Sequence, residues 1–317
     1  MMPLPKVACQ LLEKGAEVRL NPHPLPTPKR ALIEQLTEVD AVIADGLTVF
    51  DAEVMKASPR LKVIARYGVG YDNVDLEAAR ASGIYVTFTP GVLSEAVAEL
   101  TVGLMLCLSR RLIEAHKYVK GGAWAKGDYP FPLGTDLCGK VVGIVGLGRI
   151  GAEVARRTWA FKMCVLYNDL VRNTKAEQLY GARLMDLGDL LRASDFVTLH
   201  VALSPQTERL IGAKELRLMK PTAYLINTSR GRVIDQTALV EALRLGKIAG
   251  AALDVFDVEP IPEDDLLLGL DNVVLMPHVG SATSETRVGM AEMAVKDVIR
   301  VLKGERPNNI ANRELAE

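Results

Sequence analysis

Arg230, Glu259 and His278 are the residues of this sequence whose types and positions best suit catalysis. Each follows an apolar run typical of a buried strand, and in parallel sheets ligands bind just beyond the carboxyl ends of the strands. A carboxylate orients an imidazole and favours its protonated form, so a glutamate and a histidine make an acid–base pair. An arginine binds carboxylates with two hydrogen bonds and stabilises charge that develops on a carbonyl oxygen. Each residue alone is typical of an ordinary loop, but the three in succession predict acid–base chemistry at a carbonyl group.

A glycine motif indicates the cofactor. Gly146, Gly148 and Gly151 form the pattern G-x-G-x-x-G between an apolar run and an amphipathic segment. The first glycine permits a tight turn, the second lets the backbone approach a pyrophosphate, and the third lets helix and strand pack closely. The helix N-terminus offers N–H groups and partial positive charge to the phosphates. Asp169, about 20 residues further on, would bind the ribose hydroxyls and repel a 2′-phosphate, which favours NAD over NADP. The neighbouring Asn168 is an alternative for part of that role.

The elements expected to position these residues alternate between strand and helix, as in α/β folds with a parallel sheet. Runs typical of strands fall at residues 40–44, 61–65, 84–88, 141–145, 164–167, 196–200, 223–227, 249–254 and 273–276, after an opening apolar run at 7–12. A helical pattern that is apolar on most sides covers about 94–118, and a final helix covers 284–303. Thr27 and Pro28 predict an N-cap and a first helical residue. Segment 121–138, with its glycines and prolines, predicts either a crossing between domains or an arm on a second subunit.

Composition narrows the class of protein. The chain has 317 residues, which predicts about two domains. Lys and Arg number 38 against 39 Asp and Glu, so no overall basic field favours nucleic acid or an anionic membrane. No apolar run approaches a membrane span and no signal peptide is visible, so we expect a cytoplasmic protein. The four cysteines and four histidines show no metal-ligand spacing, so no metal site is expected.

These motifs, in this order, resemble the D-isomer-specific 2-hydroxyacid dehydrogenase family over nearly the whole chain. The resemblance also rests on the segments ARYGVGYDNVD at 65–75 and TPGVLSEAVAE at 89–99. It implies that Arg230, Glu259 and His278 are catalytic, and that the backbone of Val69 and Gly70 binds the substrate carboxylate together with Arg230. Besides the three glycines, it implies cofactor contacts at Arg149, Ile150, Asp169, Val201, Thr228, Asp254 and Gly280.

The resemblance further implies an architecture. It predicts two Rossmann-like domains with doubly wound parallel sheets. A discontinuous, flavodoxin-like catalytic domain (1–98 plus 286–317) would surround a nucleotide-binding domain (99–285). Family members are commonly homodimers, and Trp124 lies in the segment that resembles the dimer arm. Two positions depart from the family pattern: Phe88 replaces an asparagine and Ala202 a proline.

Within the family, the chain most resembles glyoxylate/hydroxypyruvate reductases and the catalytic part of phosphoglycerate dehydrogenases. We therefore expect NAD-dependent reduction of a small 2-oxo acid to the D-2-hydroxy acid. The alternatives are 3-phosphoglycerate, D-lactate or phosphite as substrate, and an NAD(H)-sensing, corepressor-like binding protein. A basic pocket, with Arg66 and Arg287 as candidates, would favour a phosphorylated acid. The sequence leaves the physiological direction and some use of NADPH open.

Overall fold

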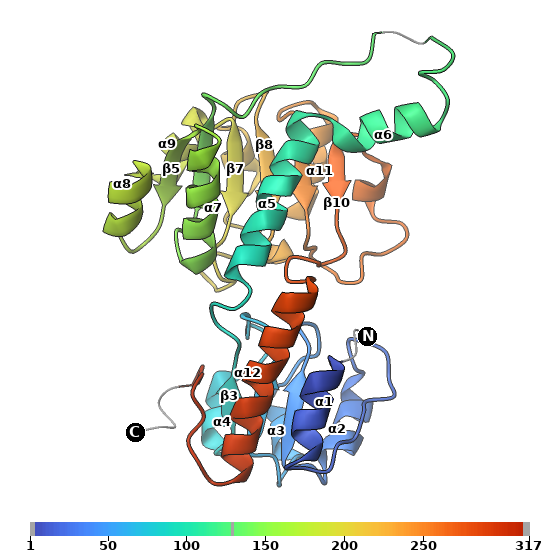
Figure 1. Cartoon of the computed structure of the whole chain (residues 1–317), viewed down its shortest axis with the longest axis vertical. Helices are drawn as coiled ribbons and strands as arrows, with labels where there is room; N and C mark the ends of the chain where they lie inside the picture. Colours follow the sequence, from blue (N-terminus) through green and yellow to red (C-terminus); the bar gives the residue numbers. More distant parts are fainter. Residues whose placement is uncertain (1–3, 128–129, 313–317) are drawn as a thin grey trace. The chain divides into compact units, whose positions relative to one another are not determined.

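The computed structural model describes residues 4–127 and 130–312, which belong to two compact units (Figure 1). One unit combines Met1–Leu93 with Ser281–Glu317, and the other is Ser94–Gly280. The division expected from the sequence, 1–98 plus 286–317 against 99–285, lies a few residues further along the chain at both crossings. In the structure, both divisions fall before a helix, α5 (Ser94–Ser109) and α12 (Ser284–Leu302), so neither helix is cut.

The unit built from both ends of the chain is a three-stranded parallel sheet between two helical layers. Its strands, in spatial order, are β1 (Ala41–Ala44), β2 (Val63–Arg66) and β3 (Tyr85–Thr87). One face is covered by α2 (Lys29–Leu36), α3 (Ala52–Lys56) and α4 (Leu76–Ala81), and the other by α1 (Lys6–Glu13) and α12. Along β2, Ile64 packs into the first layer and Val63 and Ala65 into the second. Because β2 is buried on both faces, its sequence is continuously apolar until Arg66.

The C-terminal segment returns to the edge of this small sheet. The N–H of Ala311 donates to the carbonyl of Val86 at 2.7 Å, and the side chain of Asn312 accepts from the Val86 N–H at 2.9 Å. The carboxylate of Asp297, buried in α12, accepts the N–H of Asn308 at 2.7 Å. These bonds attach the last part of the chain to its first part.

The second unit contains a seven-stranded parallel sheet whose order is β10-β9-β8-β7-β4-β5-β6. The strands are β4 (Val141–Val145), β5 (Cys164–Asn168), β6 (Arg183–Leu184), β7 (Phe196–Leu199), β8 (Tyr224–Asn227), β9 (Gly250–Leu253) and β10 (Val273–Leu275). The chain winds outward from β4 to β6 and then restarts at β7, on the other side of β4. This doubly wound arrangement confirms the predicted fold class, and ligands bind where the order reverses, beyond the carboxyl ends of β4 and β7.

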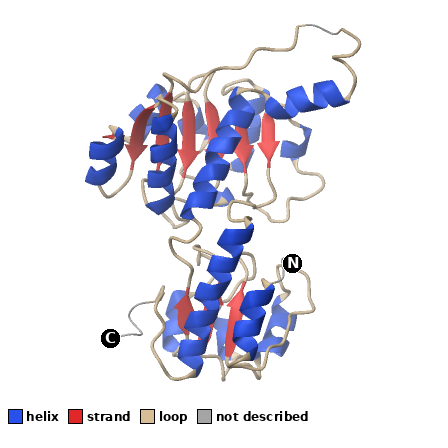
Figure 2. Cartoon of the chain, viewed as in Figure 1, coloured by secondary structure: helices blue, strands red, loops and turns tan. Residues whose placement is uncertain are grey.

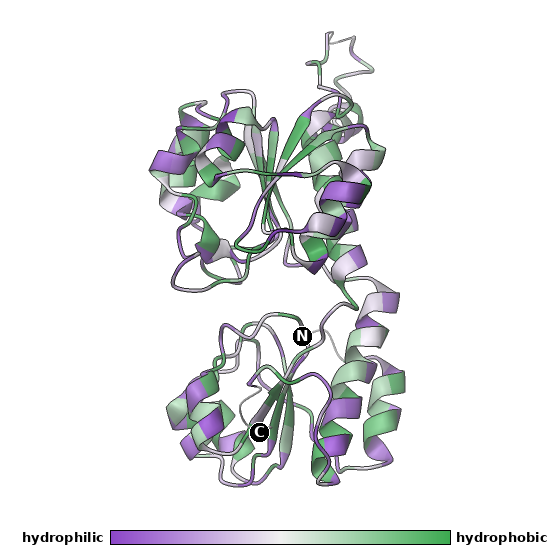
Figure 3. Ribbon diagram, turned by 90° about the vertical axis from the view of Figure 1, so that its left-hand side faces the viewer, coloured by the Kyte–Doolittle hydropathy of each residue, from purple (hydrophilic) through white to green (hydrophobic). Residues whose placement is uncertain are grey.

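Helices cover both faces of the larger sheet (Figure 2). One layer is α5, α7 (Arg149–Ala160) and α8 (Thr174–Tyr180), and the other is α9 (Leu187–Ala193), α10 (Ala213–Leu216) and α11 (Gln236–Arg244). Two 3-10 turns, η1 (Gly231–Val233) and η2 (Leu266–Gly269), lie in the loops. In Figure 3 the strands of each unit are mostly hydrophobic, and hydrophilic residues gather on the outer helices. The cores therefore lie between sheet and helices in each unit.

Several predicted elements differ from the structure. The helix expected at 94–118 is two helices, α5 and α6 (Leu112–Lys120), because Arg111 adopts a left-handed backbone with φ 53°. The opening run 7–12 belongs to α1, where Ala8 and Leu12 share the buried face. Pro28 is the N-cap of α2 rather than its first residue, and Thr27 instead accepts a side-chain hydrogen bond from Asn21 at 2.8 Å. The two-residue strand β6 was not predicted because both of its residues are exposed and no apolar run marks it.

Across residues 4–127 and 130–312, no helix combines the length and apolar character that a membrane crossing requires.

Candidate active site

The glycine-rich turn joins β4 to α7 at the edge where the strand order of the larger sheet reverses. Gly146 has φ 94°, and a Cβ there would lie 2.8 Å from the backbone of His200. A Cβ on Gly151 would lie 2.1 Å from the Gly146 carbonyl oxygen, so α7 packs directly on the turn. A Cβ on Gly148, in contrast, would meet no atom within 4 Å. The turn is thus closed toward the protein and open at the N-terminus of α7, which fits a pyrophosphate.

Other predicted cofactor contacts lie on the elements around this turn. Arg149 and Ile150 are the first two residues of α7. The N atom of Val201 would lie 2.8 Å from a Cβ on Gly146, so the segment after β7 touches the turn. Thr228 follows β8, and its hydroxyl lies 3.1 Å from that of Thr101 on α5.

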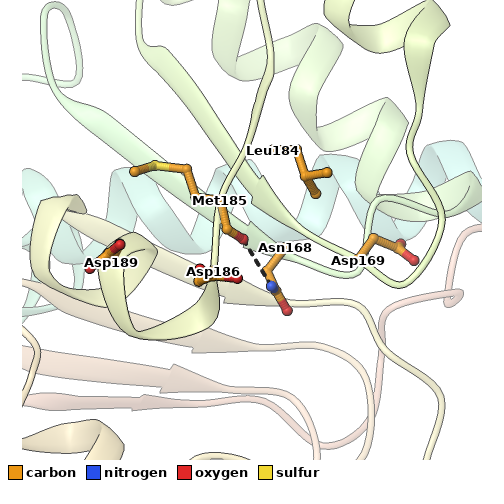
Figure 4. A pocket seen from close by; sticks show the side chains of 6 residues that line it. All are labelled: Asn168, Asp169, Leu184, Met185, Asp186 and Asp189. Atoms are coloured by element: carbon orange, nitrogen blue, oxygen red, sulfur yellow. Dashed lines mark hydrogen bonds between the residues drawn. The ribbon is translucent and has the colours of Figure 1, made fainter.

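Asp169 follows β5 and borders a cavity of about 430 Å³ (Figure 4). Its two carboxylate oxygens accept the N–H groups of Leu147 at 2.7 Å and Val171 at 3.0 Å. Asn168 donates to the carbonyl of Met185 at 2.9 Å and so ties the end of β5 to the end of β6. The cavity is lined by Asn168, Asp169, Leu184, Met185, Asp186 and Asp189. Three carboxylates therefore face one space, which suits hydroxyl donors and opposes a phosphate.

Asp186 and Asp189 were not singled out in the sequence. Asp186 is the N-cap of α9, yet its side chain makes no capping hydrogen bond, and Asp189 pairs with Arg192 at 3.0 Å. Their position just after a strand is the sequence feature that could have identified them, but that strand, β6, was not predicted.

Arg230 lies in a turn organised by Asn227, a fully buried residue at the end of β8. The Asn227 side-chain oxygen accepts the N–H of Ser229 at 3.0 Å, and its NH₂ donates to the Arg230 carbonyl at 2.8 Å. Arg230 Nη1 donates to the carbonyl of Ser229 at 2.8 Å. The amide of Asn227 thus fixes both ends of the turn that carries the guanidinium.

Gly231 lets this turn approach the loop that carries Glu259. A Cβ on Gly231 would lie 1.9 Å from the carbonyl carbon of Phe256 and 2.5 Å from the N atom of Asp257. Both are backbone atoms of the loop that continues to Glu259. The Arg230 turn and the Glu259 loop therefore pack backbone against backbone.

Glu259 and His278, which the sequence predicts to be an acid–base pair, are hydrogen-bonded in the structure. The Nδ1 of His278 lies 2.6 Å from one carboxylate oxygen of Glu259, whose other oxygen accepts the N–H of Phe256 at 3.0 Å. The Glu259 side chain is 14% exposed and that of His278 is 41% exposed. His278 has φ 54°, a left-handed conformation that is uncommon for a histidine. The carboxylate is thus held from behind, and the imidazole remains accessible to a substrate.

Asp254 holds the histidine loop beside β9. Its carboxylate, 1% exposed, accepts the N–H groups of Val279 and Gly280, each at 2.8 Å. Burial raises the pKa of Asp254 above its ordinary value. Asp254 and Gly280, predicted as cofactor contacts, therefore bond to each other next to His278.

His200 offers a contrast with His278. Burial lowers the pKa of His200 to about 3, so this imidazole is neutral at physiological pH. Its Nε2 lies 2.9 Å from the Thr198 hydroxyl, and no carboxylate of residues 4–127 and 130–312 bonds to it. Of these two strand-end histidines, His278 is the one that bonds to a carboxylate. Among the described residues no group of His, Cys, Asp or Glu is arranged to hold a metal ion.

In the other unit, Val69 and Gly70 lie in the loop after β2. The N–H of Thr89 donates to the Gly68 carbonyl at 2.9 Å, and Arg66 Nε donates to the Gly70 carbonyl at 3.2 Å. Arg287 places its guanidinium 5.5 Å from the centre of the Tyr67 ring.

The two departures from the family pattern have simple surroundings. Phe88 packs edge-on against Tyr71 with ring centres 5.5 Å apart, so it braces the outer end of the Val69–Gly70 loop. The carbonyl of Ala202 accepts the Thr207 hydroxyl at 2.6 Å.

Comparison with known proteins places this geometry in a family. The sequence model described as "D-isomer specific 2-hydroxyacid dehydrogenase, NAD binding domain" matches residues 102–280. A glyoxylate reductase of Thermococcus litoralis is 46% identical over 316 residues, which cover 98% of this chain and 95% of the relative. The crystal structure of the TT0316 protein of Thermus thermophilus has a TM-score of 0.89 at 44% identity and covers 98% of this chain and 97% of that one.

A D-lactate dehydrogenase of Aquifex aeolicus, solved with NAD and lactic acid, has a TM-score of 0.86 at 29% identity and covers 98% of this chain and 97% of that one. The matched NAD-binding domain includes the glycine-rich turn, Asp169 and the Glu259–His278 pair. The chain is therefore an NAD-dependent oxidoreductase and belongs to the D-isomer-specific 2-hydroxyacid dehydrogenase family.

Proposed function

We propose that this protein reduces glyoxylate, and the related small acid hydroxypyruvate, to the 2-hydroxy acid with NADH. The observation that carries the proposal is the bond between His278 and Glu259, at the carboxyl edge of an NAD-binding sheet and in contact with the Arg230 turn through Gly231. The relatives named glyoxylate reductase support the choice of substrate, and their being enzymes weighs against the corepressor-like alternative.

His278 is the proton donor of this mechanism. Its Nδ1 is engaged by Glu259, so the proton that moves is the one on Nε2. Bound NADH supplies the hydride that reaches the substrate carbon. His278 delivers its proton to the carbonyl oxygen, and the Glu259 carboxylate stabilises the imidazolium before that transfer. In the reverse direction the neutral imidazole is the base.

Arg230 and the Val69–Gly70 loop bind the substrate. The guanidinium neutralises charge on the carbonyl oxygen and pairs with the carboxylate. For the Val69–Gly70 loop, the family resemblance implies that the backbone N–H groups bind the substrate carboxylate. We infer the D configuration for chiral products from the family.

The surroundings of Arg66 and Arg287 favour a substrate without a phosphate. Arg66 is 1% exposed and bonds to the Gly70 carbonyl, and Arg287 stacks on Tyr67. Both guanidinium groups, one at the end of β2 and the other on α12, are thus engaged by protein groups, which weighs against 3-phosphoglycerate.

The test is NADH oxidation at 340 nm by the purified protein with glyoxylate, hydroxypyruvate, pyruvate, 3-phosphohydroxypyruvate and a longer 2-oxo acid. We expect kcat/KM to be highest for the first two. Tight NADH binding without turnover of any acid would contradict the proposal and restore the sensor alternative.

The carboxylates around the nucleotide cavity predict a strong preference for NADH. Replacing Asp169 with alanine removes hydrogen bonds from a charged acceptor, so we expect KM for NADH to rise about 10- to 100-fold. Use of NADPH should improve little until Asp186 is also changed to asparagine, because that carboxylate borders the same cavity. Steady-state kinetics with both coenzymes measures this, with D271N as the control, since Asp271 does not line the cavity. Efficient NADPH use by D169A alone would contradict the role given to Asp186.

We also infer a homodimer in which the segment around Trp124 is the arm. No residue of α6 is buried, and Leu112, Val119 and Trp124 are about half exposed within the described part of the chain. The cytoplasmic location stays a prediction.

A further inference from the structure

Arg66 has surroundings unusual for an arginine. It is the last residue of β2, the central strand of the small sheet, and it is the largest fully buried side chain of the described residues. A buried guanidinium keeps its positive charge, because arginine does not deprotonate in proteins. Burying such a charge is unfavourable unless nearby polar or charged groups interact with it. Its position at the carboxyl end of a strand is where functional loops begin.

The loop that Arg66 contacts is held by its carbonyls. Arg66 Nε binds the Gly70 carbonyl at 3.2 Å, and the Thr89 N–H binds the Gly68 carbonyl at 2.9 Å. The N–H and carbonyl of one trans peptide point in opposite directions, so the bond from Thr89 turns the Val69 N–H away from Thr89. In the described part of the chain, neither Val69 nor Gly70 donates its N–H to another protein group.

Glycines on both sides of Val69 make this conformation intrinsically flexible. A Cβ on Gly68 would meet no atom within 4 Å, so packing does not fix the backbone there. The bond to the Gly68 carbonyl fixes the peptide that carries the Val69 N–H, and the bond from Arg66 fixes the peptide that follows Gly70. The peptide that carries the Gly70 N–H is therefore held between two fixed neighbours.

We propose that Arg66 is a positioning residue that presents the Val69 and Gly70 N–H groups to the substrate carboxylate and places a fixed positive charge behind them. This rests on the proposed function, in which that loop binds the carboxylate. In a low-dielectric setting the charge stabilises a bound anion more than it would in water. Arg66 acts through the loop and does not itself contact substrate.

Three variants test the proposal. R66M keeps much of the apolar volume and removes both the charge and the donor, while R66K keeps the charge and loses the Nε–H. I64A is the matched control, because Ile64 lies in the same strand, is fully buried and packs into the layer of α2, α3 and α4. Each variant is measured for thermal stability, Kd of NADH, KM and kcat for glyoxylate, and Ki of oxalate, an unreactive carboxylate analogue.

For R66M we expect KM for glyoxylate and Ki for oxalate to rise together, about 10- to 100-fold, with kcat changed less than about threefold. R66K should recover part of this loss, and the NADH Kd should stay within about twofold in both. I64A should lower the melting temperature without changing KM or Ki. A merely structural role for Arg66 would make R66M behave like I64A.

Unchanged KM and Ki in folded R66M would overturn the proposal, and if R66M does not fold, unchanged values in R66K would do the same. If the wild-type protein does not turn over glyoxylate, the proposed function fails first. Oxalate binding to the NADH complex, followed by calorimetry in wild type and R66M, then still decides the role of Arg66.

Discussion

Replacing His278 with asparagine should lower kcat for glyoxylate about 10²- to 10⁴-fold, the range of a lost general acid. Asparagine suits this position because it tolerates the left-handed backbone that His278 adopts at φ 54°. Its amide can still donate to Glu259, which His278 Nδ1 contacts at 2.6 Å. The variant therefore keeps the loop and its partner and removes Nε2, the atom that carries the transferred proton in the proposed mechanism. Single-turnover and steady-state assays with NADH measure the loss.

Binding of NADH by this variant should remain within about twofold of wild type, because the glycine turn and the Asp169 cavity lie on other elements. The matched variant is E259Q, which keeps the hydrogen-bonded shape and removes the charge. It should lose less than H278N, since the imidazole stays in place. A kcat of H278N within about threefold of wild type would remove His278 from the mechanism.

Replacing Gly231 with alanine should abolish most activity although the residue touches no substrate in the mechanism. The added Cβ would lie 1.9 Å from the carbonyl carbon of Phe256, and ordinary contact between carbon atoms needs about 3.5 Å. The Arg230 turn and the Glu259 loop must therefore separate by more than about 1 Å. A displacement of that size costs about 10²-fold in rate when it misplaces catalytic groups. We expect kcat/KM to fall by at least that factor.

Stability should also fall, by about 1–3 kcal/mol, the usual cost of overpacking a close contact. Thermal unfolding measures this beside the assay. Gly269 provides the control, because a Cβ there meets no atom within 4 Å and its φ is not in the left-handed region. G269A should leave both rate and stability near wild type. If G231A matched G269A in activity, the backbone contact would have no part in positioning Glu259.

The local sequence was sufficient to predict most strands of the larger sheet. Strand β4 lies at the predicted residues 141–145, and the other strands of that unit except β6 lie within or close to their apolar runs. Strands β4, β7, β8 and β9 are buried on both faces, which makes their sequences continuously apolar and easy to recognise. The glycine turn was equally recognisable from the sequence. The positive φ at Gly146 and the close approach of Gly151 to the Gly146 carbonyl both require glycine.

Patterns of apolar residues gave wrong helix boundaries where the burial of a side chain depends on distant parts of the chain. The pattern that predicted one helix over 94–118 continues through Leu112 and Ile113, but those side chains are exposed on α6. Periodicity records which residues are apolar, and it does not record whether anything packs against them. The break at Arg111 is therefore a property of the folded unit.

The sequence by itself determined the chemical groups of this protein: an arginine, a glutamate and a histidine after three strands, a glycine turn for a pyrophosphate and an aspartate after the next strand. The roles predicted for these groups rest on short motifs and on the order of the motifs along the chain. Both are properties of the sequence and do not depend on the fold. Only the tertiary structure decided the distances between segments. It brought Glu259 to 2.6 Å from His278, the Gly231 turn onto the Phe256 backbone, Asp186 to the cavity of Asp169, and Arg66 into the core beneath Gly70. Contacts between residues far apart in the sequence depend on how strands and helices pack, and no single segment encodes that packing.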